Sequence, residues 1–170
     1  MVALTKLNKF LDHLEEYFGV ISLIAASGLI FLNVVMRYVF STSIPWSGEA
    51  ARYLIIWFIF IGSSFAVRER AHAKVDVLVS YVSPRVQKVL SILASFFAIN
   101  FCVFLIVSGI QTVQNVAAFS SITPALEIPM YIPYLAIPVG ASLMLYRFSQ
   151  LIVEDMKSDP NNQDVEEDHL

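Results

Sequence analysis

The sequence predicts an all-α membrane protein with four transmembrane helices and an amphipathic surface helix at its N-terminus. The first observation is a run of 38 residues, from Val89 to Leu126, that contains no Asp, Glu, Lys or Arg. A hydrocarbon core about 30 Å thick needs about 20 apolar residues of helix for each crossing. The second observation is the composition, with 57% hydrophobic and 15% charged residues, whereas soluble domains carry about 25% charged residues.

Four apolar segments with charged residues at their ends predict the spans. We expect them at about residues 17–37, 48–68, 84–119 and 129–150, within a membrane domain covering residues 17–153. The third helix would be roughly 50 Å long at about 1.5 Å per residue, so it must tilt, bend or project from the membrane. Pro138 lies inside the fourth span and predicts a kink, because proline removes an intrahelical hydrogen bond.

Residues 1–16 predict an amphipathic helix on the cytoplasmic surface. Leucines recur there at helical spacing, and charged residues occupy the other sides. One alternative is a helical extension of the first span into water. The apolar run after this segment could also belong to a signal peptide, because Lys6 and Lys9 resemble its basic region. The 20 uncharged residues that follow, Tyr17–Met36, exceed the usual apolar stretch of about 7–15 residues, so we interpret them as an uncleaved span.

The distribution of Lys and Arg predicts that both termini are cytoplasmic. In that orientation nine of the eleven basic residues lie inside, and only Arg37 and Arg52 lie outside, as the positive-inside rule favours. The acidic segment 154–170 is then a cytoplasmic tail, which we expect to be disordered. We also expect the chain to be a separate polypeptide of the bacterial inner membrane.

Several functional classes are disfavoured by residues that the spans lack. The span centres hold no ionisable group, and the single Cys102 supports neither a disulfide nor a thiolate metal cluster. His13, His72 and His169 fall outside the spans, which argues against a haem-binding anchor of a respiratory enzyme. A small four-helix exporter would need a carboxylate in the first span, which has none. We expect no enzyme activity, no catalytic residue, no cofactor, no metal and no nucleic acid partner.

Two polar clusters near span ends are candidate partner interfaces. In the first, Glu49 lies in the first turn of the second span, where the helix dipole favours an anion, after Ser47 as a candidate N-cap. Arg52, three residues on, can pair with Glu49. The second cluster is RERAHAKVD, residues 68–76. Helix-end electrostatics and topology are the simpler explanations. The candidate interface residues are Asn33, Arg37, Trp46, Glu49, Arg52, Trp57, Arg68, His72 and Asp76.

Three strings in this order carry a family resemblance: NVVMRYVF, then IPWSGEAARYLIIWFIFIGSSFAVRERAHAKVDVL, then TPALEIPMYIPYLAIPVG. They resemble the small membrane subunit, of the Q or DctQ type, of tripartite ATP-independent periplasmic (TRAP) transporters. Members of that family often carry two adjacent acids before the arginine, and this chain has Gly48-Glu49 there. Any contact made by such an acid pair would fall to Glu49 alone.

The resemblance implies a subunit of a three-part importer. In such an importer a periplasmic binding protein captures an organic anion, and a large membrane subunit moves it with a sodium gradient. The small subunit stiffens and widens the stationary part of the large subunit, and it helps to seat the binding protein. The implied partners are therefore the large subunit, the binding protein and the lipid bilayer. Sialic acid and C4-dicarboxylates are the expected substrates, with sialic acid preferred from overall likeness.

Overall fold

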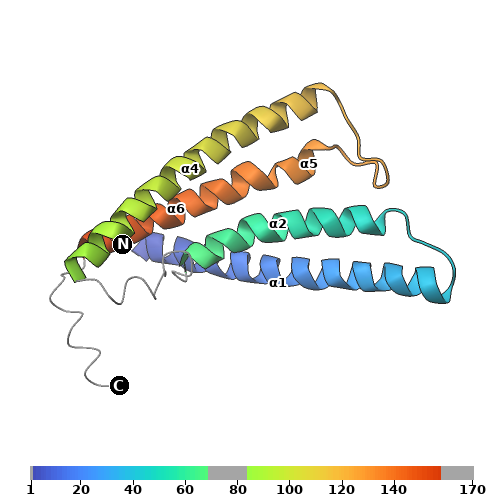
Figure 1. The fold of residues 1–170 in the computed structure, drawn as a ribbon, viewed down its shortest axis with the longest axis horizontal. Helices are drawn as coiled ribbons and strands as arrows, with labels where there is room; N and C mark the ends of the chain where they lie inside the picture. Colours follow the sequence, from blue (N-terminus) through green and yellow to red (C-terminus); the bar gives the residue numbers. More distant parts are fainter. Residues whose placement is uncertain (1, 69–83, 158–170) are drawn as a thin grey trace, which may run out of the picture.

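The computed structural model describes residues 2–68 and 84–157, and the statements below concern these residues. They form helices α1 (Val2–Val39), α2 (Ser47–Arg68), α4 (Pro84–Ala118), α5 (Tyr131–Tyr134) and α6 (Ala136–Lys157) (Figure 1). Four helical segments are long and apolar enough to cross a membrane: Leu11–Val39, Ser47–Arg68, Val89–Ala118 and Tyr131–Val153. The predicted fold class, an all-α protein with four membrane-spanning helices, is confirmed.

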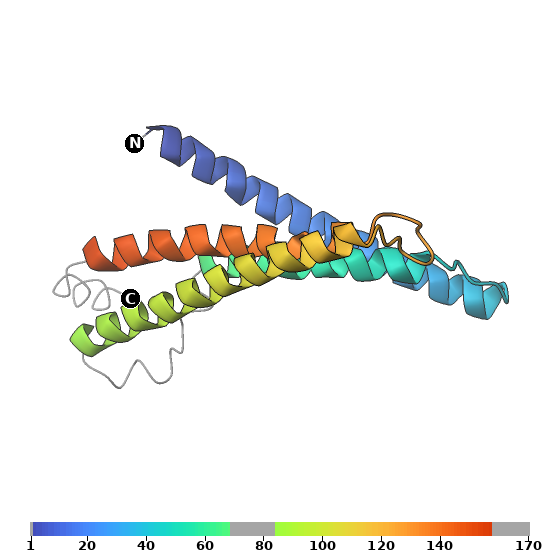
Figure 2. The same ribbon diagram turned by 90° about the horizontal axis from the view of Figure 1, so that it is seen from above.

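The helices form two antiparallel pairs that are joined through the middle. Helix α1 packs along α2, α4 packs along α6, and α2 also packs against α6. The pairs diverge toward the end that carries the α1–α2 connection and the loop after α4 (Figure 1). The view from above places the N-terminal end of α1 and the C-terminal end of α6 at the opposite end of the molecule (Figure 2). We call the first the splayed end and the second the terminal end.

The N-terminal segment and the first span form one uninterrupted helix, α1. Glu15, Gly19, Ser22 and Ala26 are all buried, and their spacing of four, three and four residues matches the 3.5-residue period of a packed helical seam. Small residues let the backbones approach closely, so this stripe explains how α1 lies along α2.

Two glycines, Gly140 on α6 and Gly109 on α4, permit the other close contacts. A Cβ atom at position 140 would lie 2.6 Å from the Cβ atom of Phe60 and 2.8 Å from its carbonyl oxygen. A Cβ atom at position 109, on α4, would lie 3.0 Å from the Cδ atom of Pro138. Helices α2, α4 and α6 can therefore approach closely because these two positions carry no side chain.

Pro138 affects the fourth span one turn earlier than its own position. The helix is interrupted at Leu135, between α5 and α6, although Leu135 keeps helical dihedral angles. A proline nitrogen cannot donate to the carbonyl oxygen four residues before it, here that of Tyr134. The interruption therefore falls one residue after the Tyr134 acceptor rather than at the proline.

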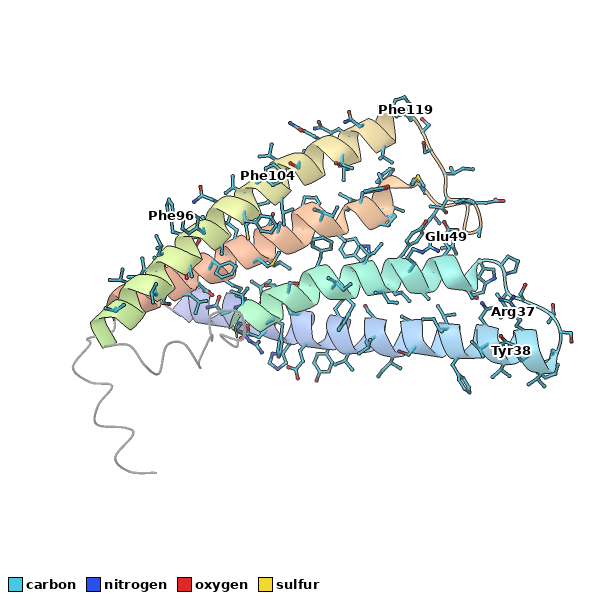
Figure 3. All side chains as sticks on the ribbon, in the orientation of Figure 1. Arg37, Tyr38, Glu49, Phe96, Phe104 and Phe119 are labelled. Atoms are coloured by element: carbon cyan, nitrogen blue, oxygen red, sulfur yellow. The ribbon has the colours of Figure 1, made fainter. Side chains whose placement is uncertain are left out.

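Helix α4 lies at the edge of the bundle and is apolar on all sides. It contacts only α6 and α5 substantially within the described part of the chain. Phe96, Phe104 and Phe119 are exposed, and Figure 3 shows them on the side that faces away from α6. Such a surface requires lipid or another membrane protein to cover it.

Candidate functional site

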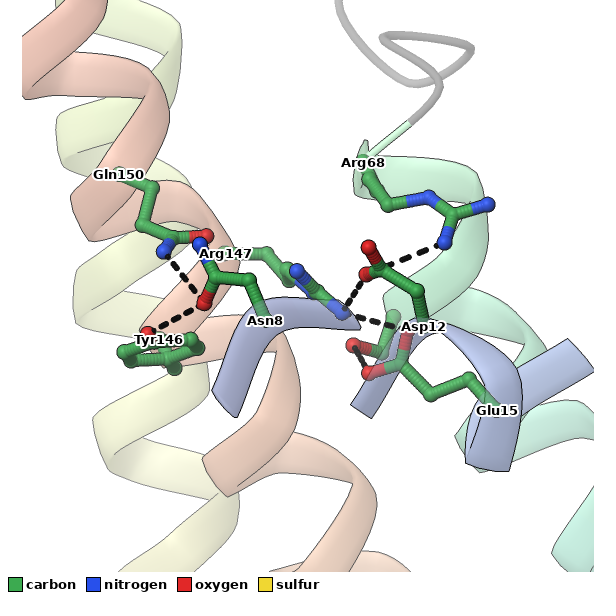
Figure 4. Close-up of polar contacts among 8 residues, drawn as sticks. Asn8, Asp12, Glu15, Arg68, Tyr146, Arg147 and Gln150 are labelled. Carbon is green, nitrogen blue, oxygen red and sulfur yellow. Dashed lines mark hydrogen bonds and ion pairs between the residues drawn. The ribbon is translucent and has the colours of Figure 1, made fainter. Parts of the chain in front are cut away.

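Charged side chains from three helices meet at the terminal end, in a group that we call the ionic cluster (Figure 4). The guanidinium of Arg147, on α6, is almost completely buried. Its Nη2 atom lies 2.7 Å from Oδ1 of Asp12 and 3.0 Å from Oε2 of Glu15, both on α1. From α2, Arg68 Nη1 lies 3.1 Å from Oδ1 of Asp12, and the Ser64 hydroxyl donates to Oε1 of Glu15 at 2.9 Å. The cluster therefore links α1, α2 and α6.

A second polar layer lies beside the ionic cluster. The side-chain oxygen of Asn8 accepts a hydrogen bond from the Tyr146 hydroxyl at 2.7 Å and another from the Gln150 amide at 3.1 Å. Both donors flank Arg147 on α6. The N-terminal part of α1 is thus attached to the bundle by its polar side chains.

The contribution of the ionic cluster to the stability of the bundle depends on how deeply its charges are buried. An isolated buried ion is costly, whereas a buried ion whose partners surround it is tolerated. Arg147 and Glu15 are both buried, and Asp12 and Arg68 are partly exposed. Two carboxylates face two guanidiniums, so the charges balance. The arrangement can hold helices together, and it leaves the buried carboxylate of Glu15 engaged by Arg147 and Ser64.

At the splayed end, Glu49 connects α2 to the loop between α4 and α5. Its Oε2 atom accepts hydrogen bonds from the backbone nitrogens of Ala125 at 2.8 Å and Leu126 at 3.0 Å. Its Oε1 atom accepts one from the Tyr53 hydroxyl at 2.5 Å. We call these three bonds the Glu49 latch. A carboxylate bridging two backbone N–H groups is a charge-assisted contact.

The loop held by the Glu49 latch is itself closed by hydrogen bonds. The backbone of Thr123 donates to the Ile128 carbonyl at 2.9 Å, and its buried side-chain oxygen accepts from the Ile128 nitrogen at 3.2 Å. Ser120 and Glu127 take positive φ angles of 48° and 55°, which non-glycine residues seldom adopt. These two left-handed residues flank the loop and let it reverse direction.

Several predicted interface residues are used inside the subunit. Asn33 accepts a hydrogen bond from the Ile44 nitrogen at 3.2 Å, Glu49 forms the latch, and Arg68 joins the ionic cluster. The Trp57 ring lies edge-on to that of Phe18, with centroids 6.2 Å apart. The Asn33 and Glu49 bonds hold loops at the splayed end, whereas the Arg68 and Trp57 contacts hold α1 against α2.

The other predicted interface residues are exposed or undescribed. Arg37, Trp46 and Arg52 are exposed at the splayed end, where Figure 3 labels Arg37. The Glu49 carboxylate accepts its hydrogen bonds from Tyr53 and the loop backbone, and no Glu49–Arg52 ion pair is among the described contacts. His72 and Asp76 lie outside the described residues.

Ser47 does not act as the predicted N-cap. Its buried hydroxyl donates a hydrogen bond to the Ile44 carbonyl at 2.8 Å, and so closes the turn before α2. The Ala50 nitrogen already donates to the Trp46 carbonyl at 2.9 Å. The helical hydrogen bonds therefore begin one residue earlier than an N-cap at Ser47 requires.

The sequence-based reading missed the ionic cluster, although the signal was present. It placed Glu15 among the water-facing charges of a surface helix, and this placement is wrong. Glu15 lies in register with Gly19, Ser22 and Ala26, which face α2. Arg147 likewise occupies the buried stripe of α6 that begins with Gly140. A charge in register with small or apolar residues on a seam predicts a buried partner.

Comparison with known proteins assigns the family. Residues 26–158 match the family model described as "Tripartite ATP-independent periplasmic transporters, DctQ component". The chain belongs to this family. The resemblance seen in the sequence is confirmed. This is a family of transporter subunits and not of enzymes, and with four apolar helices it indicates a multi-pass protein of the inner membrane.

Named relatives agree with the family assignment. The C4-dicarboxylate TRAP transporter small permease protein DctQ of Vibrio cholerae is 27% identical over 86% of this chain and 73% of that protein. A putative TRAP transporter small permease protein of Haemophilus influenzae is 31% identical over 81% of this chain and 84% of that protein. The sialic acid TRAP transporter permease protein SiaT of H. influenzae is 32% identical over 84% of this chain and 23% of that longer protein.

Proposed function

We propose that this TRAP small permease subunit is the scaffold of a sodium-driven importer of organic anions, and that a large membrane subunit carries the transport path. The ionic cluster is the observation that supports this role. Transporters keep ionisable residues in the membrane to bind ions or relay protons. In the described part of this chain, the buried charges of Arg147 and Glu15 neutralise each other and hold helices.

The names of relatives support the pairing with a large subunit. The isethionate TRAP transporter permease protein DctMQ and the sialic acid permease SiaT each match most of this chain over less than a quarter of their own length. In those proteins the region that matches this chain belongs to a longer permease polypeptide. We propose that this chain makes the equivalent association with a large membrane subunit, and that a periplasmic binding protein docks on the complex.

The substrate proposal follows the same relatives. Their names include C4-dicarboxylate, sialic acid, isethionate and ectoine transporters. We propose a carboxylate of the sialic acid or C4-dicarboxylate type, contacted by the partner proteins. Described residues of this chain supply no group of three or more His, Cys, Asp or Glu that could hold a metal ion, and the scaffold role asks for no cofactor.

Contact with the large subunit is proposed for the exposed residues of the splayed end. Arg37, Trp46 and Arg52 are exposed, whereas Asn33 and Glu49 act on the contact by shaping this end. Trp57, in the middle of α2, acts on it only through its packing against Phe18. Arg68, His72 and Asp76 are proposed for the cytoplasmic side. Both termini are placed in the cytoplasm by the positive-inside rule. Reporter fusions at Ser121 and at the C-terminus test this orientation, and a periplasmic C-terminus would contradict it.

Copurification tests the assignment. A tag on this chain, expressed with its neighbouring genes, should recover a much larger multi-span membrane protein after mild solubilisation. The Leu14→Ala variant removes surface area at an exposed position of α1 near the terminal end. It should recover as much of the large protein as the natural chain does. Purification of this chain free of any large membrane protein, from cells that express both, would refute the proposal.

A further inference from the structure

A crevice of about 380 Å³ lies between α2 and the α5–α6 segment at the splayed end. Its α2 wall follows one helical face, with Arg52, Ile56 and Phe60 four residues apart. Its other wall is also largely apolar. The full lining is Arg52, Tyr53, Ile56, Phe60, Met130, Pro133, Tyr134 and Ile137.

The crevice has a charge at one end only. Arg52 is exposed, and no ion pair to it is among the contacts of the described residues. The nearby Glu49 carboxylate has both oxygens engaged in the latch, and the Tyr53 hydroxyl donates to it. The charge of Glu49 still attracts Arg52, but both oxygens of that carboxylate already accept hydrogen bonds from other donors. The N–H donors of the Arg52 guanidinium can therefore bind an anion, and their planar fork matches the oxygens of a phosphate.

The length of the crevice fits a lipid. Arg52 and Phe60 are eight residues apart, about 12 Å along the helix axis, close to the depth of about 15 Å of one hydrocarbon leaflet. A lipid with its phosphate at Arg52 would therefore extend an acyl chain along the apolar lining of the crevice to about the middle of the bilayer.

We propose that this crevice binds one glycerophospholipid, with its phosphate on Arg52 and an acyl chain between Ile56, Phe60 and Ile137. The lipid would fill the gap where the two helix pairs diverge. The subunit alone supplies every contact, so the proposal does not depend on the proposed function, and failure of copurification would not bear on it.

A second groove supplies an internal comparison. It has a volume of about 430 Å³ and lies between α1 and α2, with Gly19, Phe58 and Gly62 among its lining residues. Its lining contains no Lys or Arg, and Glu15 at its end is paired with Arg147. The groove therefore offers no cation to a phosphate, whereas a neutral apolar molecule would enter both grooves.

Photo-crosslinking of the full-length chain in nanodiscs tests the proposal. The probe is phosphatidylglycerol with a diazirine in its acyl chain, and the matched control is diacylglycerol with the same chain. Phosphatidylglycerol should label the peptides around residues 56–60 and 133–137 at least fivefold more than those of the α1–α2 groove. Diacylglycerol should show no such preference. Equal labelling of both grooves by phosphatidylglycerol would overturn the proposal.

Two arginine variants distinguish binding at Arg52 from a general attraction of the lipid to positive charge. Arg52→Gln should reduce the phosphatidylglycerol labelling of the crevice at least fivefold, whereas Arg37→Gln, which removes an exposed charge outside the crevice, should leave it unchanged. Unchanged labelling in Arg52→Gln, or an equal loss in both variants, would contradict the site. If Arg52→Gln fails to fold, the comparison of phosphatidylglycerol with diacylglycerol on the natural chain tests the proposal. Labelling should persist in the copurified complex, and its loss there would assign the crevice to a protein partner.

Discussion

The two ends of the helix bundle are held together by different means. At the terminal end, α1, α2 and α6 meet through side chains, with Arg147 buried between Asp12 and Glu15. At the splayed end the helix pairs diverge, and Glu49 bonds to the backbone of a loop. The first arrangement fixes the positions of three helices, whereas the second fixes one loop and leaves a crevice beside it. A scaffold with one rigid end and one open end can present the open end to a partner.

The largest predicted effect tests the rigid end. Arg147→Met leaves Glu15 buried without its counter-charge, and removal of one partner from a buried ion pair costs about 3–5 kcal/mol. The free energy of unfolding, measured by denaturant titration in mixed micelles, should fall by this amount. The triple variant Asp12→Asn, Glu15→Gln, Arg147→Gln removes the charges together and should recover most of the loss. Equal stability of Arg147→Met and the natural chain would reduce the ionic cluster to a surface feature.

A smaller effect is expected where the two pairs join. Gly140→Ala places a Cβ atom against the Cβ and backbone of Phe60, and overpacking of this kind costs about 1–3 kcal/mol. Gly28→Ala is the matched control, because nothing lies within 4 Å of a Cβ atom there. The same titration should show a loss only for Gly140→Ala. A loss of equal size in both variants would mean that close approach of α2 and α6 is not the cause.

The Glu49 latch should act locally. Glu49→Ala leaves the nitrogens of Ala125 and Leu126 without their acceptor, so the loop should open more readily. Amide hydrogen exchange at these two residues should accelerate at least tenfold, while exchange at the terminal end is unchanged. Glu49→Gln, which keeps an acceptor oxygen, should give an intermediate rate. Unchanged exchange in Glu49→Ala would show that the loop does not depend on the latch.

Arg52 should affect the stability of the subunit least. Arg52 is exposed, and surface substitutions usually change stability by less than about 0.5 kcal/mol, so Arg52→Ala should unfold at nearly the same denaturant concentration as the natural chain. If Arg52 also meets the large subunit in a partly desolvated contact, recovery of that subunit should fall by an amount equivalent to about 2–5 kcal/mol. Normal copurification and normal uptake by the variant complex would exclude Arg52 from that interface.

The sequence predicted the four spans but not the contacts that join them at either end. The uncharged run from Val89 to Leu126 and the other apolar segments predict the four spans, because bilayer thickness sets their length. Helix count and span ends follow from such one-dimensional patterns. The Glu49 latch does not, because Glu49 and Ala125 are 76 residues apart, and only the packing of α2 near the loop brings them together.

The ionic cluster was not predicted because each helix was interpreted from its own sequence alone. Asp12 and Glu15 read as the polar face of an amphipathic helix when α1 is considered alone. Their partner Arg147 is 132 residues from Glu15, and its position just after an apolar run reads as a span end. The seam of α1, with Glu15 in register with Ser22 and Ala26, was the one local sign that this acid faces another helix.

Uptake by proteoliposomes tests the scaffold account most directly. Vesicles should be prepared with this chain alone, with the copurified complex, and with the complex plus its binding protein, all under an inward sodium gradient. The account predicts no uptake of labelled sialic acid or C4-dicarboxylate by the chain alone and sodium-dependent uptake of the cognate substrate by the full set. Sodium-dependent uptake by this chain alone would contradict the account.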